Sequence, residues 1–378
     1  MLIIINVLTK EKQMSKLTKI LFSVLTSVAL STSAFAGEFA VTGGAKATYT
    51  IMGQDGTSGT HASGKGVGIS NEFSLTASGE LDNGMTWSYA QDIDNATVQD
   101  DANIAIGTDY GTFKICVSEC PLSTKYGFDN SAYGVGSDTG YGGGSTSSGA
   151  SANTMQYGSN INSYNNIQYH TPADLLPLGI TFKAAMTPGR AGGTANDSVH
   201  STTGVTHAGS MKQYALTMAP IDGLDLKASY YTFGDKGSVD DRQTQEGGSY
   251  SANYTIGQVS VGYGETLHAA AQQKGVFTTK DSAAVQHYEN DAYSIGFAVN
   301  DNLSISFTEE SSTKVQKKKA ALANTTTRSD VEMEITTIDV AYTIGGATLG
   351  LSNSETTNDS YSNNTDTTET ILALTLAF

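Results

Sequence analysis

The chain alternates apolar and polar residues over about sixteen separate segments, and a period of two is that of a β-strand. Each segment has roughly the ten residues that a tilted strand needs to cross a bilayer. We therefore expect an all-β chain of about sixteen antiparallel strands. The first segment carries these residues at every second position: Phe39, Val41, Gly43, Ala45, Ala47, Tyr49 and Ile51.

The connections between segments alternate in length. Long polar stretches separate short turns, which are expected at residues 82–84, 108–111, 220–223, 257–258, 300–302 and 345–346. One intermediate connection, 172–179, contains two prolines and also suits a turn. Short turns at one end and long loops at the other are typical of a transmembrane antiparallel up-and-down β-barrel.

Charged residues test whether the apolar phase faces lipid, because Lys or Arg there costs about 2–4 kcal/mol at mid-membrane. Mid-strand charges fall on the opposite phase: Lys46, Glu72, Asp92, Lys114, Lys183, Asp225, Lys227 and Asp339. Charges on the apolar phase, such as Glu265 and Glu309, lie near the loop-side ends of segments, where the cost is smaller. Aromatic residues also gather at segment ends, as in the girdles of membrane barrels.

The first residues are expected to be removed on export. Lys16 and Lys19 precede an apolar run, 20–30, and the stretch ends at Ala34-Phe35-Ala36, which is typical of a secretory signal peptide. Residues 1–13 resemble an extra leader, and 37–378 would form one barrel domain. The net charge is −16 and becomes more negative without the leader, so nucleic acid is not an expected partner.

A barrel of this width cannot be filled by its own side chains and leaves an aqueous channel. The longest connection, 118–164, is therefore expected to fold inward as a constriction. Its acidic residues Glu119, Asp129 and Asp138 would face lumen-directed lysines on the opposite wall: Lys46, Lys114, Lys183 and Lys227. In the alternative interpretation, 142–152 is only a flexible surface tip and the lysines are solvated wall residues.

Two smaller features have modest chemical implications. Cys116 and Cys120 belong to an exported chain, where a local disulfide is favoured over a metal pair or two free thiols. The cluster Lys317-Lys318-Lys319 lies in a predicted external loop, where contact with anionic lipopolysaccharide competes with simple solvation. We expect no metal site and no cofactor.

Several stretches resemble the general porin family of Gram-negative bacteria, in particular the alphaproteobacterial porins. They are the leader ending Ala34-Phe35-Ala36, the opening 37–43, the block 72–89 and the ending 372–378. The resemblance implies a homotrimer of sixteen-stranded barrels with an inward third loop. It also implies that the terminal Phe378 is the signal read by the outer-membrane assembly machinery. Two departures are the Cys116–Cys120 pair and the absence of a compact acidic motif in the third loop.

The expected function is passive diffusion of small hydrophilic solutes and ions through an outer-membrane channel. A substrate-specific channel is the main alternative, and a surface adhesin or structural β-protein is a further one. An outer-membrane enzyme is disfavoured because the six histidines are scattered mainly over loops without a nucleophile motif beside them. Gly142-Gly143-Gly144 is not a phosphate-binding motif, since no Lys and no helix follow it.

Overall fold

The computed structural model describes residues 37–56, 63–94, 101–124, 126–132, 155–188, 210–234, 241–269, 272–273, 285–316 and 330–378. The predicted leader, residues 1–36, lies outside this part of the chain. So do Asp138, the stretch 142–152 and the cluster Lys317–Lys319. No helix among the described residues is long and apolar enough to span a bilayer.

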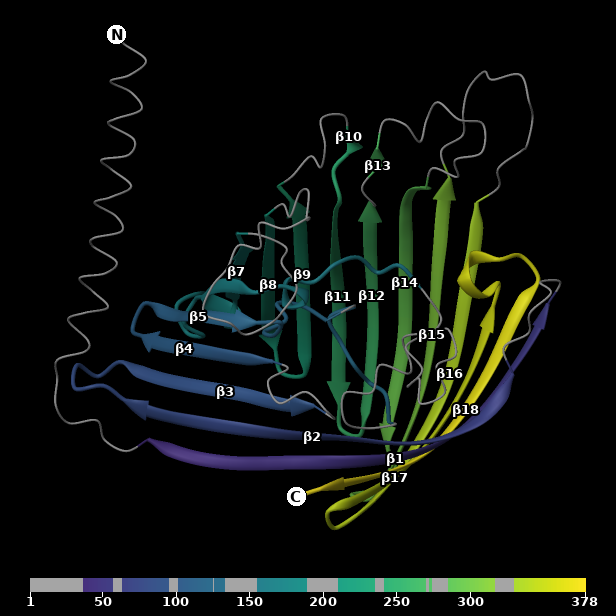
Figure 1. The fold of residues 1–378 in the computed structure, drawn as a ribbon, viewed down its shortest axis with the longest axis horizontal. Coiled ribbons are helices and arrows are strands. Elements are labelled where there is room, and N and C mark those ends of the chain that lie inside the picture. The colour runs from purple at the N-terminus through teal and green to yellow at the C-terminus, as the bar shows by residue number, and fades with distance from the viewer. Residues whose placement is uncertain are drawn as a thin grey trace, which may run out of the picture.

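Sixteen strands of the described chain close into an antiparallel barrel (Figure 1), which confirms the predicted fold class. Its first half contains β1 (Glu38–Gly56), β2 (Gly64–Glu80), β3 (Thr86–Asp94), β4 (Ala102–Thr108), β5 (Gly111–Val117), β6 (Asn166–His170), β7 (Thr181–Thr187) and β8 (Met211–Ile221). Its second half contains β9 (Leu224–Phe233), β11 (Glu246–Ile256), β12 (Val259–Ala269), β14 (Val285–Ala298), β15 (Leu303–Gln316), β16 (Val331–Ile344), β17 (Ala347–Thr357) and β18 (Thr365–Ala377). Two short strands outside the barrel, β10 (Asp241–Gln243) and β13 (Gln272–Gln273), pair with each other.

The barrel closes where β1 pairs with β18. Neighbouring strands are neighbours in sequence everywhere else in the barrel once β10 and β13 are set aside. Full closure leaves no open sheet edge, so each strand finds backbone partners on both sides.

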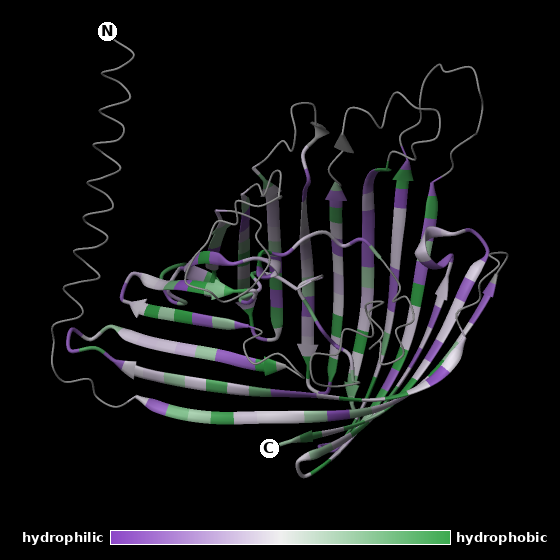
Figure 2. Ribbon diagram, in the orientation of Figure 1, coloured by the Kyte–Doolittle hydropathy of each residue, from purple (hydrophilic) through white to green (hydrophobic). Residues whose placement is uncertain are grey.

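Hydrophobic and hydrophilic residues alternate along the strands (Figure 2), and this alternation decides which face of each strand points outward. On β18 the side chains of Leu372, Leu374 and Leu376 are exposed on the outside, whereas Ile371 and Ala373 are buried inside. On β1 the outward Val41 and Ile51 are exposed, and the inward Thr48 and Thr50 are buried. The outer surface of the barrel is therefore an apolar band.

One strand extends further than the alternation around its centre suggested. β2 begins at Gly64, and Val67 and Ile69 continue its outward face with about three quarters of their surface exposed. The glycines at 64, 66 and 68 on the inward phase of this stretch resemble a loop in sequence.

The two ends of the barrel differ. One end, called here the short-turn end, holds tight connections such as 222–223, 257–258 and 345–346. Gly223 and Gly257 occupy these turns with φ of 78° and 59°, a left-handed conformation that favours glycine. The other end, the long-connection end, includes the 3₁₀ turn η5 (Asp359–Tyr361) between β17 and β18.

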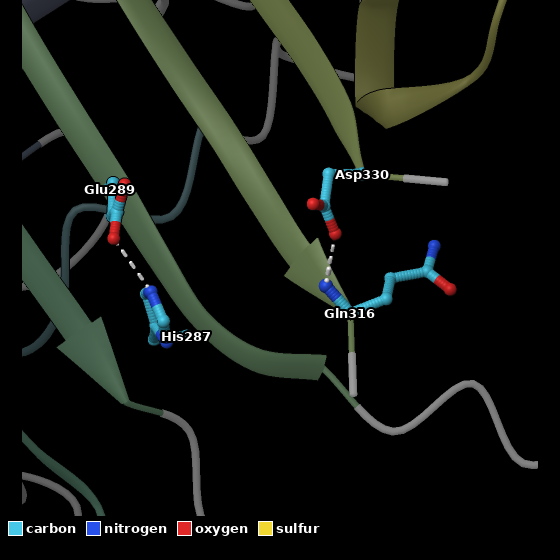
Figure 3. A network of polar contacts seen from close by, with 4 residues as sticks. All are labelled: His287, Glu289, Gln316 and Asp330. Carbon is cyan, nitrogen blue, oxygen red and sulfur yellow. Dashed lines mark hydrogen bonds and ion pairs between the residues drawn. The ribbon is translucent and has the colours of Figure 1, made fainter. Parts of the chain in front are cut away.

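Outward carboxylates lie near the long-connection end and contact tyrosines, a histidine or backbone. Tyr230 donates its phenolic hydrogen to Glu246 Oε2 (2.8 Å), and Tyr263 donates to Glu265. Figure 3 shows His287 Nε2 beside Glu289 Oε1 (2.8 Å), together with the backbone N–H of Gln316 donating to Asp330. These polar groups mark the border of the outer apolar band.

Candidate channel constriction

The described parts of the connection between β5 and β6 fold into the barrel, and we call residues 118–164 the inward loop. Its outgoing arm is 118–132 and its returning arm is 155–164; the residues between the arms, and Lys125, lie outside the described part. The outgoing arm crosses the inner face of the sheet formed by the later strands (Figure 1). Both arms contact inward-facing side chains of strands from β6 to β16, as detailed below.

A disulfide between Cys116 and Cys120 fixes the base of the inward loop, with a Cα–Cα distance of 6.1 Å. Gln168 on β6 donates to the carbonyl of Cys120 (2.5 Å), and Asn166 donates to the carbonyl of Glu119 (3.1 Å). The Glu119 carboxylate accepts a hydrogen bond from Asn103 on β4 (2.7 Å). The carboxylate is therefore engaged with the wall beside the loop base.

The outgoing arm packs where the wall lacks side chains. A Cβ placed on Gly262 would lie 2.6 Å from the Phe128 ring, and one on Gly264 would lie 2.9 Å from Tyr126 Cβ. Tyr126, Phe128 and Ala292 form one buried apolar cluster. Inward-facing glycines on β12 thus make a shallow seat for the two aromatic side chains.

The far end of the outgoing arm is tied to β15 and β16. Ser131 Oγ donates to Asp339 Oδ2 (2.7 Å), and the backbone N–H of Ala132 donates to Ser306 Oγ (2.7 Å). Ser306 also donates to the same Asp339 oxygen (3.2 Å). Asp339 is almost fully buried, so its carboxylate serves as a fixed acceptor for the arm.

The returning arm is held by β14, β15 and η5. Tyr157 donates to Glu310 Oε2 (3.2 Å), and Asn290 donates to the carbonyl of Gln156 (3.1 Å). Burial raises the pKa of the Tyr157 phenol well above its ordinary value, and the charge of Glu310 raises it further. Tyr157 therefore stays protonated and remains a donor. Tyr361 of η5 accepts from the backbone N–H of Gln156 (3.0 Å).

Apolar packing adds to these polar anchors. One buried cluster joins loop residues to β7, β8 and β9: Leu122, Ile161, Ala185, Met211, Ala215, Tyr231 and Phe233. A second joins the returning arm to β16 and η5: Met155, Val331, Met333, Ile335 and Tyr361. Burial of a large apolar side chain contributes about 1.5–3 kcal/mol, so these clusters hold both arms strongly.

The residues predicted to line the constriction separate into two groups. Lys46 on β1 lies across the barrel from the loop arms, where Glu72 and Asp92 of β2 and β3 share its wall. Lys114, Lys183 and Lys227 lie instead on β5, β7 and β9, the side along which the loop runs. The predicted arrangement placed all four lysines opposite the loop.

The acidic loop residues also differ from one another. Glu119 is engaged at the loop base, as described above, whereas the side chain of Asp129 is exposed and accepts from the backbone N–H of Ser131 (2.9 Å). Phe378 ends the chain at the closure of the barrel, where its backbone pairs with Gly43.

Sequence reasoning missed the wall residues that hold the loop, among them Asp339, Glu310 and Tyr361. Two signals were present in the sequence. Inward-phase glycines on one segment, Gly262 and Gly264, leave room for another part of the chain. Apolar residues on the inward phase of β16, including Met333 and Ile335, need a partner inside the barrel. Neither signal identifies that partner.

The fold is that of porin-type outer-membrane barrels. Solved structures that it resembles include the loop L8 deletion mutant of OmpT, an outer membrane protein of Vibrio cholerae (14% identity, TM-score 0.59, covering 91% of this chain and 100% of that one). Another is OmpF of Salmonella typhi in complex with daunomycin (13%, 0.54, 91% and 98%). A third is an anion-selective porin from Comamonas acidovorans (12%, 0.57, 90% and 100%). No family model and no curated protein matches the chain.

Proposed function

We propose that the chain is a bacterial outer-membrane porin that forms a water-filled channel for passive diffusion of small hydrophilic solutes and ions. One observation carries the proposal: the loop arms lie along the inside of β6 to β16, whereas inward-facing side chains of β2 such as Ser70, Glu72 and Thr76 are exposed. A constriction attached to one side of a sixteen-stranded barrel leaves a path for water along the other. The inward loop then sets the size limit.

The walls of this path support diffusion of hydrated solutes. Lys46, Glu72 and Asp92 bring charges of both signs to the wall opposite the loop, and exposed Asp129 faces them from the loop side in this proposal. Opposed charges across a narrow passage order water and select solutes by charge as well as size. No cofactor and no catalytic group is part of the proposal.

Planar-bilayer recordings of the purified protein test this function. A passive channel should show a conductance that rises linearly with salt concentration and persists without block by sugars or amino acids. Saturable block by one solute at low concentration would identify the substrate-specific channel instead. A protein that remains soluble without detergent and does not conduct would favour the adhesin or structural alternative.

The apolar outer band supports residence in the outer membrane, in contact with lipid and lipopolysaccharide. The predicted signal peptide supplies the export route. Short turns would then lie on the periplasmic side and long connections outside, as in other barrels of this kind.

Two polar side chains on the outer face support a homotrimer. Asn71 on β2 and Gln91 on β3 point outward between apolar neighbours such as Ile69 and Phe73. An amide side chain costs less free energy in a protein contact than in hydrocarbon, so this face suits contact with another subunit better than contact with lipid. One solved structure similar to this chain, of OmpT of Vibrio cholerae, is described as a trimer form.

Mass measurement in mild detergent tests the assembly. We expect unheated protein to have the mass of three chains and to fall to one chain on heating, and Asn71→Arg should shift unheated protein to single barrels because it places a charge in the subunit contact. A wild-type mass of one chain would contradict the homotrimer. Lys212, an outward exposed residue on β8, gives a control, since Lys212→Gln should leave the trimer intact.

A further inference from the structure

Three lysines form a descending row on the wall beside the inward loop. Gln168, which holds the loop base, is the cross-strand partner of Lys114, and it also pairs with Ala185 of β7. Lys183 lies two residues from Ala185 toward the short-turn end. Lys183 pairs with Ala215 of β8, and Lys227 pairs with Thr217, again two residues closer to that end.

The outgoing arm contacts the last lysine of this row, the one nearest the short-turn end. A Cβ placed on Gly127 would lie 3.3 Å from Lys227 Cβ and 3.4 Å from Lys227 Cδ, so the arm rests on the stem of that side chain. The Lys227 side chain as a whole is still exposed, which leaves its ammonium group accessible from the lumen. The row therefore runs from the loop base down to the level at which the outgoing arm crosses the wall.

The positive charges of the three lysines add to one local positive potential. Lys183 lies close enough to Lys114 and Lys227 to be repelled by both. In the described part of the chain, none of the three amines forms an ion pair or a hydrogen bond with protein. The carboxylate nearest in sequence, Asp225, also faces inward two residues from Lys227 but is not within ion-pair distance of it.

The spacing of the row suits an anion with more than one charge. β5, β7 and β9 are separated by one strand each, so neighbouring lysine backbones lie roughly 10 Å apart. The flexible four-carbon stems allow adjacent ammonium groups to converge on one ligand. His170, the cross-strand partner of Lys183, adds a polar ring at the same place.

We propose that Lys114, Lys183 and Lys227 form a binding site for small multivalent anions, such as di- and tricarboxylates and phosphates, on the wall beside the constriction. The proposal rests on the channel function above and names the solute class that the channel concentrates. Since ammonium groups without protein partners attract anions most strongly where water is confined, such solutes dwell beside the loop before they pass.

Block of the potassium chloride current by citrate tests the site. In the wild-type protein, citrate should reduce the current. In the variant Lys183→Gln/Lys227→Gln, the citrate concentration for half block should rise by about tenfold or more, because two charge-assisted contacts are lost. Inorganic phosphate serves as a second probe, and the variant should again need a higher concentration for half block than the wild type.

A matched pair of substitutions controls for net charge. Lys65→Gln/Lys212→Gln removes two lysines whose side chains are exposed on the outward phase, and it should leave citrate block unchanged. Equal weakening by both pairs, or a conducting wild-type channel without citrate block, would overturn the anion site and leave the channel function standing. A wild-type barrel that does not conduct at all would refute the channel function and the site with it.

Discussion

Deletion of Phe378 should reduce the amount of folded barrel in the outer membrane by about tenfold or more while synthesis continues, because the final residue completes the closure of the sheet. The backbone N–H of Gly43 donates to the carbonyl of Phe378 (2.7 Å), and the N–H of Phe378 donates to the carbonyl of Gly43 (2.9 Å). Both bonds extend the pairing of β1 with β18. Their loss leaves two backbone groups of Gly43 unpaired at the edge of an apolar band.

The side chain of Phe378 contributes separately. Its ring lies 5.6 Å from the ring of Phe73 on β2, across β1, and remains mostly exposed on the outer face. If the resemblance to porins extends to assembly, this exposed terminal ring is also what the assembly machinery binds. Phe378→Ala keeps the backbone pairing and removes only the ring, so it separates the two contributions.

Heat-modifiable migration of outer-membrane extracts measures the folded fraction of each variant. Phe39→Ala is the control, since Phe39 is an equally exposed outward aromatic near the same end of the barrel but does not end a strand. We expect Phe39→Ala to assemble nearly as well as the wild type. Wild-type levels of folded barrel after deletion of Phe378 would show that neither the final hydrogen bonds nor the final ring is needed.

The strands could be predicted from sequence because each depends on its own alternation. Outward Leu372, Leu374 and Leu376 and inward Ala373 respond to an apolar exterior and a polar interior, and this contrast holds for every strand of a wide barrel. Turns such as 222–223 carry glycine at the position that needs a left-handed backbone. Local physics therefore defines both the elements and their phase.

The path of the inward loop could not be predicted in this way, because its anchors are remote in sequence. Ser131 and Asp339 are 208 residues apart, and Ala132 and Ser306 are 174 apart. A serine on a polar inner face looks the same in sequence whether water or a loop covers it. The alternation also predicts that Lys183 and Lys227 face the lumen. Their position beside the loop depends on which wall the loop contacts, and the alternation does not predict that wall.

The way the loop is held has a consequence for the channel. Three apolar clusters hold both arms, whereas the far end of the outgoing arm depends on hydroxyl and amide contacts to β15 and β16. An apolar cluster keeps most of its packing free energy when one polar group elsewhere is removed. Removal of a polar anchor should therefore free the far end of the arm while the rest of the loop stays in place.

Replacement of Asp339 by alanine should release that end and make the channel current noisier, with frequent steps between conductance levels. The buried carboxylate accepts from Ser131 of the arm and from Ser306 of the neighbouring strand, and loss of the one hydrogen bond between the arm and this charged acceptor costs about 1.5–3 kcal/mol. A cost of that size raises the population of the detached arm by roughly 10- to 100-fold. Single-channel recording measures the frequency and size of the steps.

Two variants make the Asp339 result specific. Asp339→Asn keeps an oxygen acceptor in the same place and should restore most of the quiet current. Asp92→Ala removes an inward carboxylate of β3 that accepts from Ser74 (2.6 Å), away from the loop anchors, and should leave the current steady. If Asp339→Ala conducts as quietly as the wild type while remaining folded, the contacts of Ser131 and Ala132 do not hold the constriction, and the apolar seat of Tyr126 and Phe128 alone suffices to fix the outgoing arm.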